Sequence, residues 1–126
     1  MGKLFWVCLG GAAGCGGRYL IGLWAVERFG TRFPAGTLAV NVVGSLLMGV
    51  LMYLGAAARL FSPDLRLALT TGMLGGFTTY SSFAHETLQY LQQGAWGLAA
   101  GYALLTTVAC VAACGAGYWI ARAVVG

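Results

Sequence analysis

The most polar stretch of an otherwise apolar chain runs from Gly72 to Glu86 and reads GMLGGFTTYSSFAHE. Two adjacent glycines are followed there by Thr78-Thr79 and Ser81-Ser82. Glycine costs backbone entropy in a helix, and serine and threonine hydroxyls compete for its hydrogen bonds. If a helix breaks here, its freed carbonyls suit a hard cation, whereas freed N–H groups and hydroxyls suit an anion. The alternative is a continuous helix whose hydroxyls bond back to their own carbonyls.

Other side chains suited to an anion lie in and beyond this stretch. Tyr80 and Phe83 are three residues apart and share a helix face, and the positive edges of aromatic rings can line an anion path. Asn41 lies inside a separate apolar segment, GTLAVNVVGSLLMG, so its amide must face other helices. The amide either bonds one helix to another or donates an N–H to a passing anion or polar solute. The residue type leaves both readings open.

A third set of polar groups follows helical spacing near the C-terminus. Tyr102, Thr106 and Cys110 are each four residues apart and form one polar stripe on a segment of mostly Ala, Val and Leu. Hydroxyls at this spacing either form a ladder of donors or bond neighbouring helices together.

The four cysteines are expected to pack rather than to bind metal. Cys8 and Cys15 share one helix face, and Cys110 and Cys114 share another, but the chain has no Cys-x-x-Cys motif. Buried cysteine usually behaves as a small hydrophobic residue, and two cysteines on one helix seldom meet disulfide geometry.

The composition indicates that these groups sit on membrane helices. Of 126 residues, 60% are hydrophobic and only 8% are charged, against about 25% in soluble domains. At about 20 residues for each span, the length predicts a single membrane domain over 1–126 with four spans, at about 4–26, 34–58, 65–91 and 95–125. Ser62-Pro63 predicts the start of the third. The sequence shows no pairing of a nucleophile with a base, so an enzyme is not expected.

Basic residues are divided almost evenly between the two expected membrane sides. One side would hold four and the opposite side two, with Arg18 ambiguous inside the first span: Lys3, Arg59, Arg66 and Arg122 against Arg28 and Arg32. This weak bias permits either one orientation or insertion in both, which would allow an antiparallel dimer. Lipid headgroups account for the net charge of +4, so no nucleic-acid partner is expected.

Small residues four apart predict tight helix packing. The pairs are Gly10 and Gly14, Ser45 and Gly49, and Gly97 and Gly101. Because a four-helix monomer has little interior for a wide polar site, function is expected to require an oligomer.

Three motifs in order along the chain resemble the CrcB/Fluc family of fluoride channels. They are GGAAGCGGRYL at 10–20, GTLAVNVVGSLLMG at 36–49 and TTGMLGGFTTYSSFAHET at 70–87. The resemblance implies an all-α membrane protein with four transmembrane helices, the third broken near its middle. It further implies an antiparallel, dual-topology homodimer with two fluoride pores in a bacterial inner membrane, for passive export of cytoplasmic fluoride.

The resemblance also implies roles for particular residues. A structural sodium ion at the dimer interface would be bound by the backbone carbonyls of Gly75 and Thr78. Arg18 and Glu86 would have structural or gating roles. The fluoride pathway would be lined by Asn41, Thr79, Tyr80, Ser81, Phe83, Tyr102, Thr106 and Cys110.

Two of these positions depart from the family pattern. Tyr80 adds a hydroxyl where phenylalanine is commoner, and Cys110 is a weaker donor than serine.

The alternative function is a small four-span proton-coupled multidrug exporter. Such a transporter needs a carboxylate embedded in its first span, and here none precedes Glu27.

Overall fold

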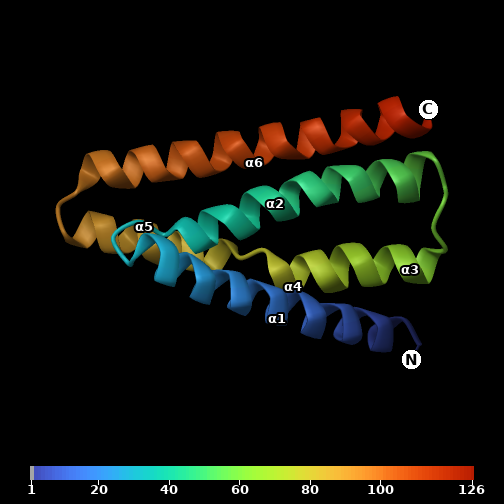
Figure 1. The fold of residues 1–126 in the computed structure, drawn as a ribbon, viewed down its shortest axis with the longest axis horizontal. Coiled ribbons are helices and arrows are strands. Elements are labelled where there is room, and N and C mark those ends of the chain that lie inside the picture. The colour runs from blue at the N-terminus through green and yellow to red at the C-terminus, as the bar shows by residue number, and fades with distance from the viewer. Residues whose placement is uncertain (1) are drawn as a thin grey trace.

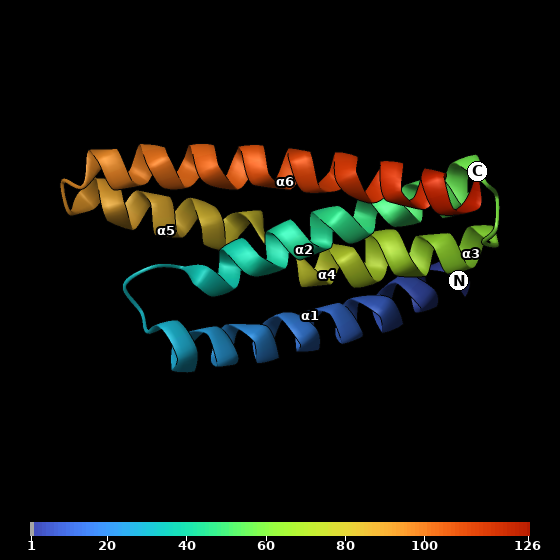
Figure 2. The same cartoon turned by 45° about the horizontal axis from the view of Figure 1, so that its top comes forward.

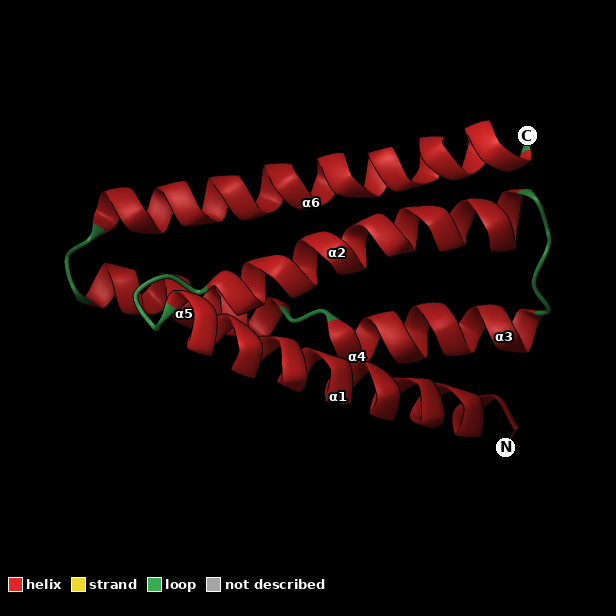
Figure 3. Ribbon diagram, in the orientation of Figure 1, coloured by secondary structure: helices red, strands yellow, loops and turns green. Residues whose placement is uncertain are grey.

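A computed structural model describes residues 2–126, which form helices and no strand (Figures 1 and 3). The all-helical prediction is therefore confirmed for these residues. Two of the elements, η1 and η2, are π-helical stretches that continue a neighbouring α-helix. In chain order the elements are α1 (Gly2–Phe29), α2 (Ala35–Met52), η1 (Tyr53–Ala57), α3 (Pro63–Leu67), η2 (Ala68–Leu74), α4 (Gly75–Phe77), α5 (Tyr80–Gln92) and α6 (Trp96–Val125).

These elements form four roughly parallel rods: α1, α2 with η1, the series α3 to α5, and α6 (Figures 1 and 2). α2 packs along α6, α1 packs along η2 and α4, and α5 packs on both α6 and α2. Both chain ends and the α2–α3 connection lie at one end of the bundle, and the other two connections lie at the opposite end.

Three helices are long and apolar enough to cross a bilayer: Gly2–Phe29, Ala35–Ala57 and Trp96–Val125. The segment expected to supply the remaining span begins where the sequence predicts. Ser62 caps α3 by accepting a hydrogen bond from the Leu65 N–H at 3.3 Å, with Pro63 in the first turn. It is then divided between α4 and α5, where Thr78 and Thr79 have extended backbone, with ψ of 156° and 109°.

Helix packing depends on glycines at backbone contact. A Cβ atom at Gly117 of α6 would overlap the Leu46 carbonyl of α2, and one at Gly49 of α2 would overlap the Cys114 carbonyl of α6. Gly10 and Gly14 likewise bring α1 to backbone contact with η2 and α4.

The third small-residue pair behaves differently. Gly97 and Gly101 have nothing within 4 Å of an added Cβ, so the packing prediction is wrong for them within one chain.

We expect Gly117→Ala to destabilise the bundle, because overpacking against fixed backbone costs about 1–3 kcal/mol. The matched control is Gly115→Ala on the same helix, where an added Cβ meets open space. Thermal unfolding of the purified protein in detergent should show a lower midpoint for Gly117→Ala alone. Equal midpoints for the two variants would contradict the close approach of α2 and α6.

Candidate functional site

The extended residues between α4 and α5 are bound by one side chain of α2. The Asn41 side-chain amide donates to the Thr79 carbonyl at 3.0 Å, and the Thr79 N–H donates to Asn41 Oδ1 at 2.7 Å. Both residues are buried. Gly44, further along α2, leaves room for the Thr78 methyl group. The Asn41 side chain therefore joins α2 to the residues between α4 and α5 by two hydrogen bonds. Its second amide hydrogen is still available to donate.

Two carbonyl groups lose their usual helix partners at this point. In a continuous α-helix the Thr79 N–H would donate to Gly75, and the Ser82 N–H would donate to Thr78. Here the Thr79 N–H donates to Asn41, and the Ser82 N–H donates to Thr79 Oγ1 at 3.2 Å. The carbonyls of Gly75 and Thr78 are thus released from the helix ladder, and Gly75 is exposed on the surface of the single chain.

Thr79 also starts α5. Its hydroxyl caps the helix and donates to Ser82 Oγ at 3.0 Å, and it lies 3.2 Å from Ser81 Oγ. We call the extended residues Thr78 and Thr79 the break. The first N–H groups of α5 therefore point back toward the break, and the N-terminus of a helix carries partial positive charge.

A cavity of about 410 Å³ lies beside the break, between α2, α5 and α6. It brings together seven of the residues that the sequence singled out: Asn41, Gly75, Thr78, Tyr80, Phe83, Thr106 and Cys110. Thr106 is only 6% exposed, and its Oγ1 is the one buried side-chain polar atom of the described residues without a hydrogen-bond partner. A buried hydroxyl of this kind is costly unless something binds it.

A row of aromatic rings continues from the cavity toward the end of the bundle that holds the α1–α2 connection. The ring centres of Tyr80 and Phe83 are 5.3 Å apart, as are those of Phe83 and Tyr102. Phe33 meets Tyr102 edge-on at 5.8 Å. Phe83 is buried, whereas Tyr80 is 80% exposed in the single chain. The two rings predicted to line an anion path therefore differ greatly in their contact with this chain.

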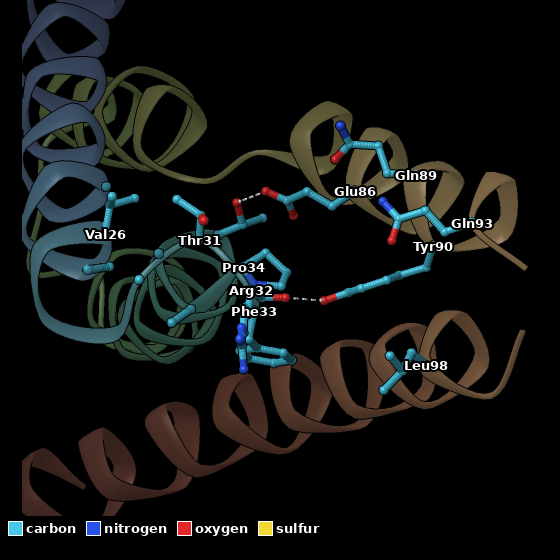
Figure 4. Close-up of a pocket in the computed structure, with 16 residues that line it drawn as sticks. Val26, Thr31, Arg32, Phe33, Pro34, Glu86, Gln89, Tyr90, Gln93 and Leu98 are labelled. Carbon is cyan, nitrogen blue, oxygen red and sulfur yellow. Dashed lines mark hydrogen bonds between the residues drawn. The ribbon is translucent and has the colours of Figure 1, made fainter. Parts of the chain in front are cut away.

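Glu86 lies beside this row with both carboxylate oxygens occupied. The Thr37 hydroxyl donates to one oxygen at 2.6 Å, and the Tyr102 hydroxyl donates to the other at 2.7 Å. In Figure 4 a dashed line marks the hydrogen bond to one carboxylate oxygen of Glu86. The Tyr102 hydrogen is thus committed to Glu86. Of the stripe Tyr102, Thr106 and Cys110, only Thr106 offers an unused hydroxyl.

A wider cavity of about 630 Å³ opens beyond Glu86 at the end of the bundle (Figure 4). Gln89 and Tyr90 of α5 and Gln93, which directly follows it, line this cavity. The Tyr90 hydroxyl donates to the Arg32 carbonyl at 3.2 Å. This bond ties the α1–α2 connection to α5.

Arg18 lies apart from these two cavities. It lines a third, of about 340 Å³, between α1, α2 and the start of α5, together with Thr79 and Ser82. Its guanidinium group is 3.7 Å from Cys15 Sγ. The break is therefore flanked on one side by a cationic cavity and on the other by the cavity that contains Thr106.

Sequence reasoning missed Thr37, Phe33 and Tyr90. A signal existed for Thr37, which precedes Asn41 by four residues and so shares its helix face. No comparable signal marks Phe33, because its contact with Tyr102 joins a connection to a distant helix.

We expect Asn41→Ala to loosen the break, because it leaves the buried N–H and carbonyl of Thr79 without partners at about 1–3 kcal/mol each. Hydrogen exchange followed by mass spectrometry should show faster exchange in peptides that contain Thr79. Ser45→Ala, one turn further along α2, removes no hydrogen bond to the break and serves as control. Unchanged exchange in Asn41→Ala would show that other contacts maintain the break.

Comparisons with known proteins agree over nearly the whole chain. The family model of CrcB-like proteins, described as Camphor Resistance (CrcB), matches residues 5–118. A protein of Anaeromyxobacter dehalogenans is 48% identical over 126 residues, which is 100% of both chains. One of Sorangium cellulosum is 47% identical over 97% of this chain and 96% of its own, and one of Agrobacterium fabrum is 47% identical over 92% and 93%. All three are named "Fluoride-specific ion channel FluC".

The match covers most of α1, all the elements from α2 to α5 and most of α6, including both sides of the break. Together with the three long apolar helices, it identifies a multi-pass membrane protein. The chain belongs to the CrcB family.

Proposed function

We propose that this chain is a fluoride-selective ion channel that lets fluoride leave the cytoplasm passively. The observation that carries the proposal is the identity of 47–48%, over nearly full length, to relatives named fluoride-specific ion channels. Because both sides of the break lie within the matched residues, the parts described above are the parts that a shared activity would use.

The fluoride path in this proposal follows the cavity beside the break. Fluoride is small and strongly hydrated, so a pore must replace its water with hydrogen-bond donors and ring edges. The unpartnered Thr106 hydroxyl, the spare amide hydrogen of Asn41 and the N–H groups that precede Ser82 at the start of α5 are such donors. Phe83 supplies a ring edge, with Thr79 and Ser81 as neighbouring hydroxyls and Cys110 as a weaker donor.

Two further pathway residues differ in what they offer. Tyr80 presents an exposed ring and hydroxyl, so a second copy of the chain is needed to enclose its side of the path. Tyr102 contributes its ring, because its hydroxyl is used by Glu86.

In this proposal, α3 to α5 together form one discontinuous membrane helix, and the active unit is an antiparallel homodimer. Backbone without partners is tolerated at membrane depth only inside protein or beside a wet path. The exposed position of Gly75 at the break supports a second chain covering it. The small difference in basic residues between the two ends of the bundle permits insertion in both orientations.

The carbonyls of Gly75 and Thr78 are suited to a structural sodium ion at this interface. Oxygen atoms are the ligands of hard cations, and these two carbonyls have lost their helix donors to Asn41 and Thr79. Two antiparallel chains would bring four such oxygens together. A bound cation would also offset the charge of fluoride nearby.

Glu86 and Arg18 have supporting roles in this scheme. Glu86 holds Thr37 and Tyr102 in place, and its two oxygens are already satisfied. Arg18 provides positive charge in the cavity on the far side of Thr79. The exporter alternative receives no support from Glu86, because a proton carrier of that class belongs in the first span.

Vesicles containing the purified protein should release fluoride, but not chloride, down a gradient, as measured with ion-selective electrodes. Chloride release equal to that of fluoride, or release of neither ion, would overturn the proposal.

The same assay with sodium replaced by a large organic cation tests the cation site, and fluoride release is expected to fall.

We expect Thr106→Val, which keeps the shape but removes the hydroxyl, to slow fluoride release. Hydrogen bonds to charged groups contribute about 1.5–3 kcal/mol, which corresponds to roughly tenfold or more. The control is Thr107→Val, whose hydroxyl donates to the Ala103 carbonyl of its own helix at 2.8 Å. Equal release from both variants would place Thr106 outside the path.

A further inference from the structure

The cavity beside the break contains two thiols, of which the proposed fluoride path uses at most one. Cys110 and Cys114 both line this cavity and are half-buried free cysteines. They are four residues apart on α6, so their Cβ atoms are neighbours, about 5–6 Å apart, on one helix face. A thiol is a poor donor to a hard anion but a strong ligand for a soft metal ion.

A third sulfur atom is brought to the same cavity by α2. Met48 is one of its lining residues. The next residue, Gly49, holds α2 at backbone contact with the Cys114 carbonyl. The three sulfur-bearing side chains therefore come from two helices whose spacing is set by their backbones.

The ligand set excludes the common tetrahedral metal centres. Zinc sites in proteins almost always have four ligands, and among residues 2–126 no three His, Cys, Asp or Glu side chains are grouped to hold a metal ion. Two thiols and one thioether instead suit a soft metal ion that needs only two thiolate ligands.

We propose that Cys110 and Cys114, with Met48 beside them, form a binding site for the mercuric ion. Each thiol releases one proton to water and forms one sulfur–mercury bond, without any change of oxidation state. The two thiolate charges then balance the divalent ion, so the buried complex is neutral. Silver or cuprous ion would leave one net negative charge in an apolar membrane site, which is unfavourable.

The same placement predicts a consequence for transport, which rests on the proposed function. Cys110 and Cys114 share the cavity with Thr106 and Phe83. A mercuric ion bound there occupies the path proposed for fluoride and stops its release.

The binding site is tested on the purified protein in detergent, titrated with mercuric chloride, without any transport assay. One variant, Cys8→Ser with Cys15→Ser, keeps the proposed site. The matched variant, Cys110→Ser with Cys114→Ser, keeps the exposed pair on α1. Free thiols are counted by maleimide labelling and mass spectrometry, and sulfur–mercury bonds are followed by ultraviolet absorption.

The variant with the α6 pair should lose both thiols at about one mercuric ion per chain and keep the ion against excess monothiol. The variant with the α1 pair should release its mercury to the monothiol. Equal retention by the two variants, or two ions bound per chain at the α6 pair, would overturn the site. Should the α6 double variant fail to fold, Cys110→Ser and Cys114→Ser singly are each expected to lose retention.

In vesicles treated with mercuric chloride and then excess monothiol, fluoride release should stay stopped in the variant that keeps the α6 pair and should recover in Cys114→Ser, which changes no residue of the proposed path. Release that continues with mercury bound would overturn the block. If the unsubstituted chain releases no fluoride at all, the proposed function fails, and the detergent measurement still decides the metal site.

Discussion

Two hydrogen bonds join the Asn41 side chain to the backbone N–H and carbonyl of Thr79, and the arrangement around the break depends on them. An extended backbone within an apolar bundle is costly unless its polar groups find partners. Asn41 supplies both partners at once from a neighbouring helix. Because the Thr79 N–H is bound there, the Gly75 carbonyl is released, and α5 begins anew with Thr79 as its cap.

The position of Asn41 also divides the surroundings of the break into two environments. On the side of α1 lie Arg18 and the hydroxyls of Thr79 and Ser82. On the side of α6 lie Thr106 and Phe83 in a cavity with few charged groups. The first environment offers an anion a full positive charge, whereas the second offers it neutral hydrogen-bond donors and ring edges.

The sequence predicted the types of residue at the site better than their pairings. Composition and glycine spacing were sufficient for an all-helical membrane bundle, the motifs contain Asn41 and Glu86, and helical spacing singled out Thr106. Which residue pairs with Asn41 depends on how far α2 is shifted along its axis relative to the break. No local sequence pattern determines this shift. The bond from Tyr102 to Glu86 likewise joins α6 to α5, and it changed the expected hydroxyl ladder into a single free hydroxyl at Thr106. Gly97 and Gly101 show the same limit: their spacing is correct for packing, but no helix of the same chain faces them.

The placement of the chain ends has a consequence for how topology can be read. Because both ends lie at one end of the bundle, reporter tags fused to the two ends of a single molecule must appear on the same side of the membrane. A population inserted in both orientations would show each tag on both sides of the membrane, and the share on each side would be the same for the two tags. Unequal proportions for the two tags would then indicate damaged or partly inserted molecules rather than a preferred orientation. The share of molecules with a tag on each side, which must be the same for both tags, therefore measures the share of molecules in each orientation.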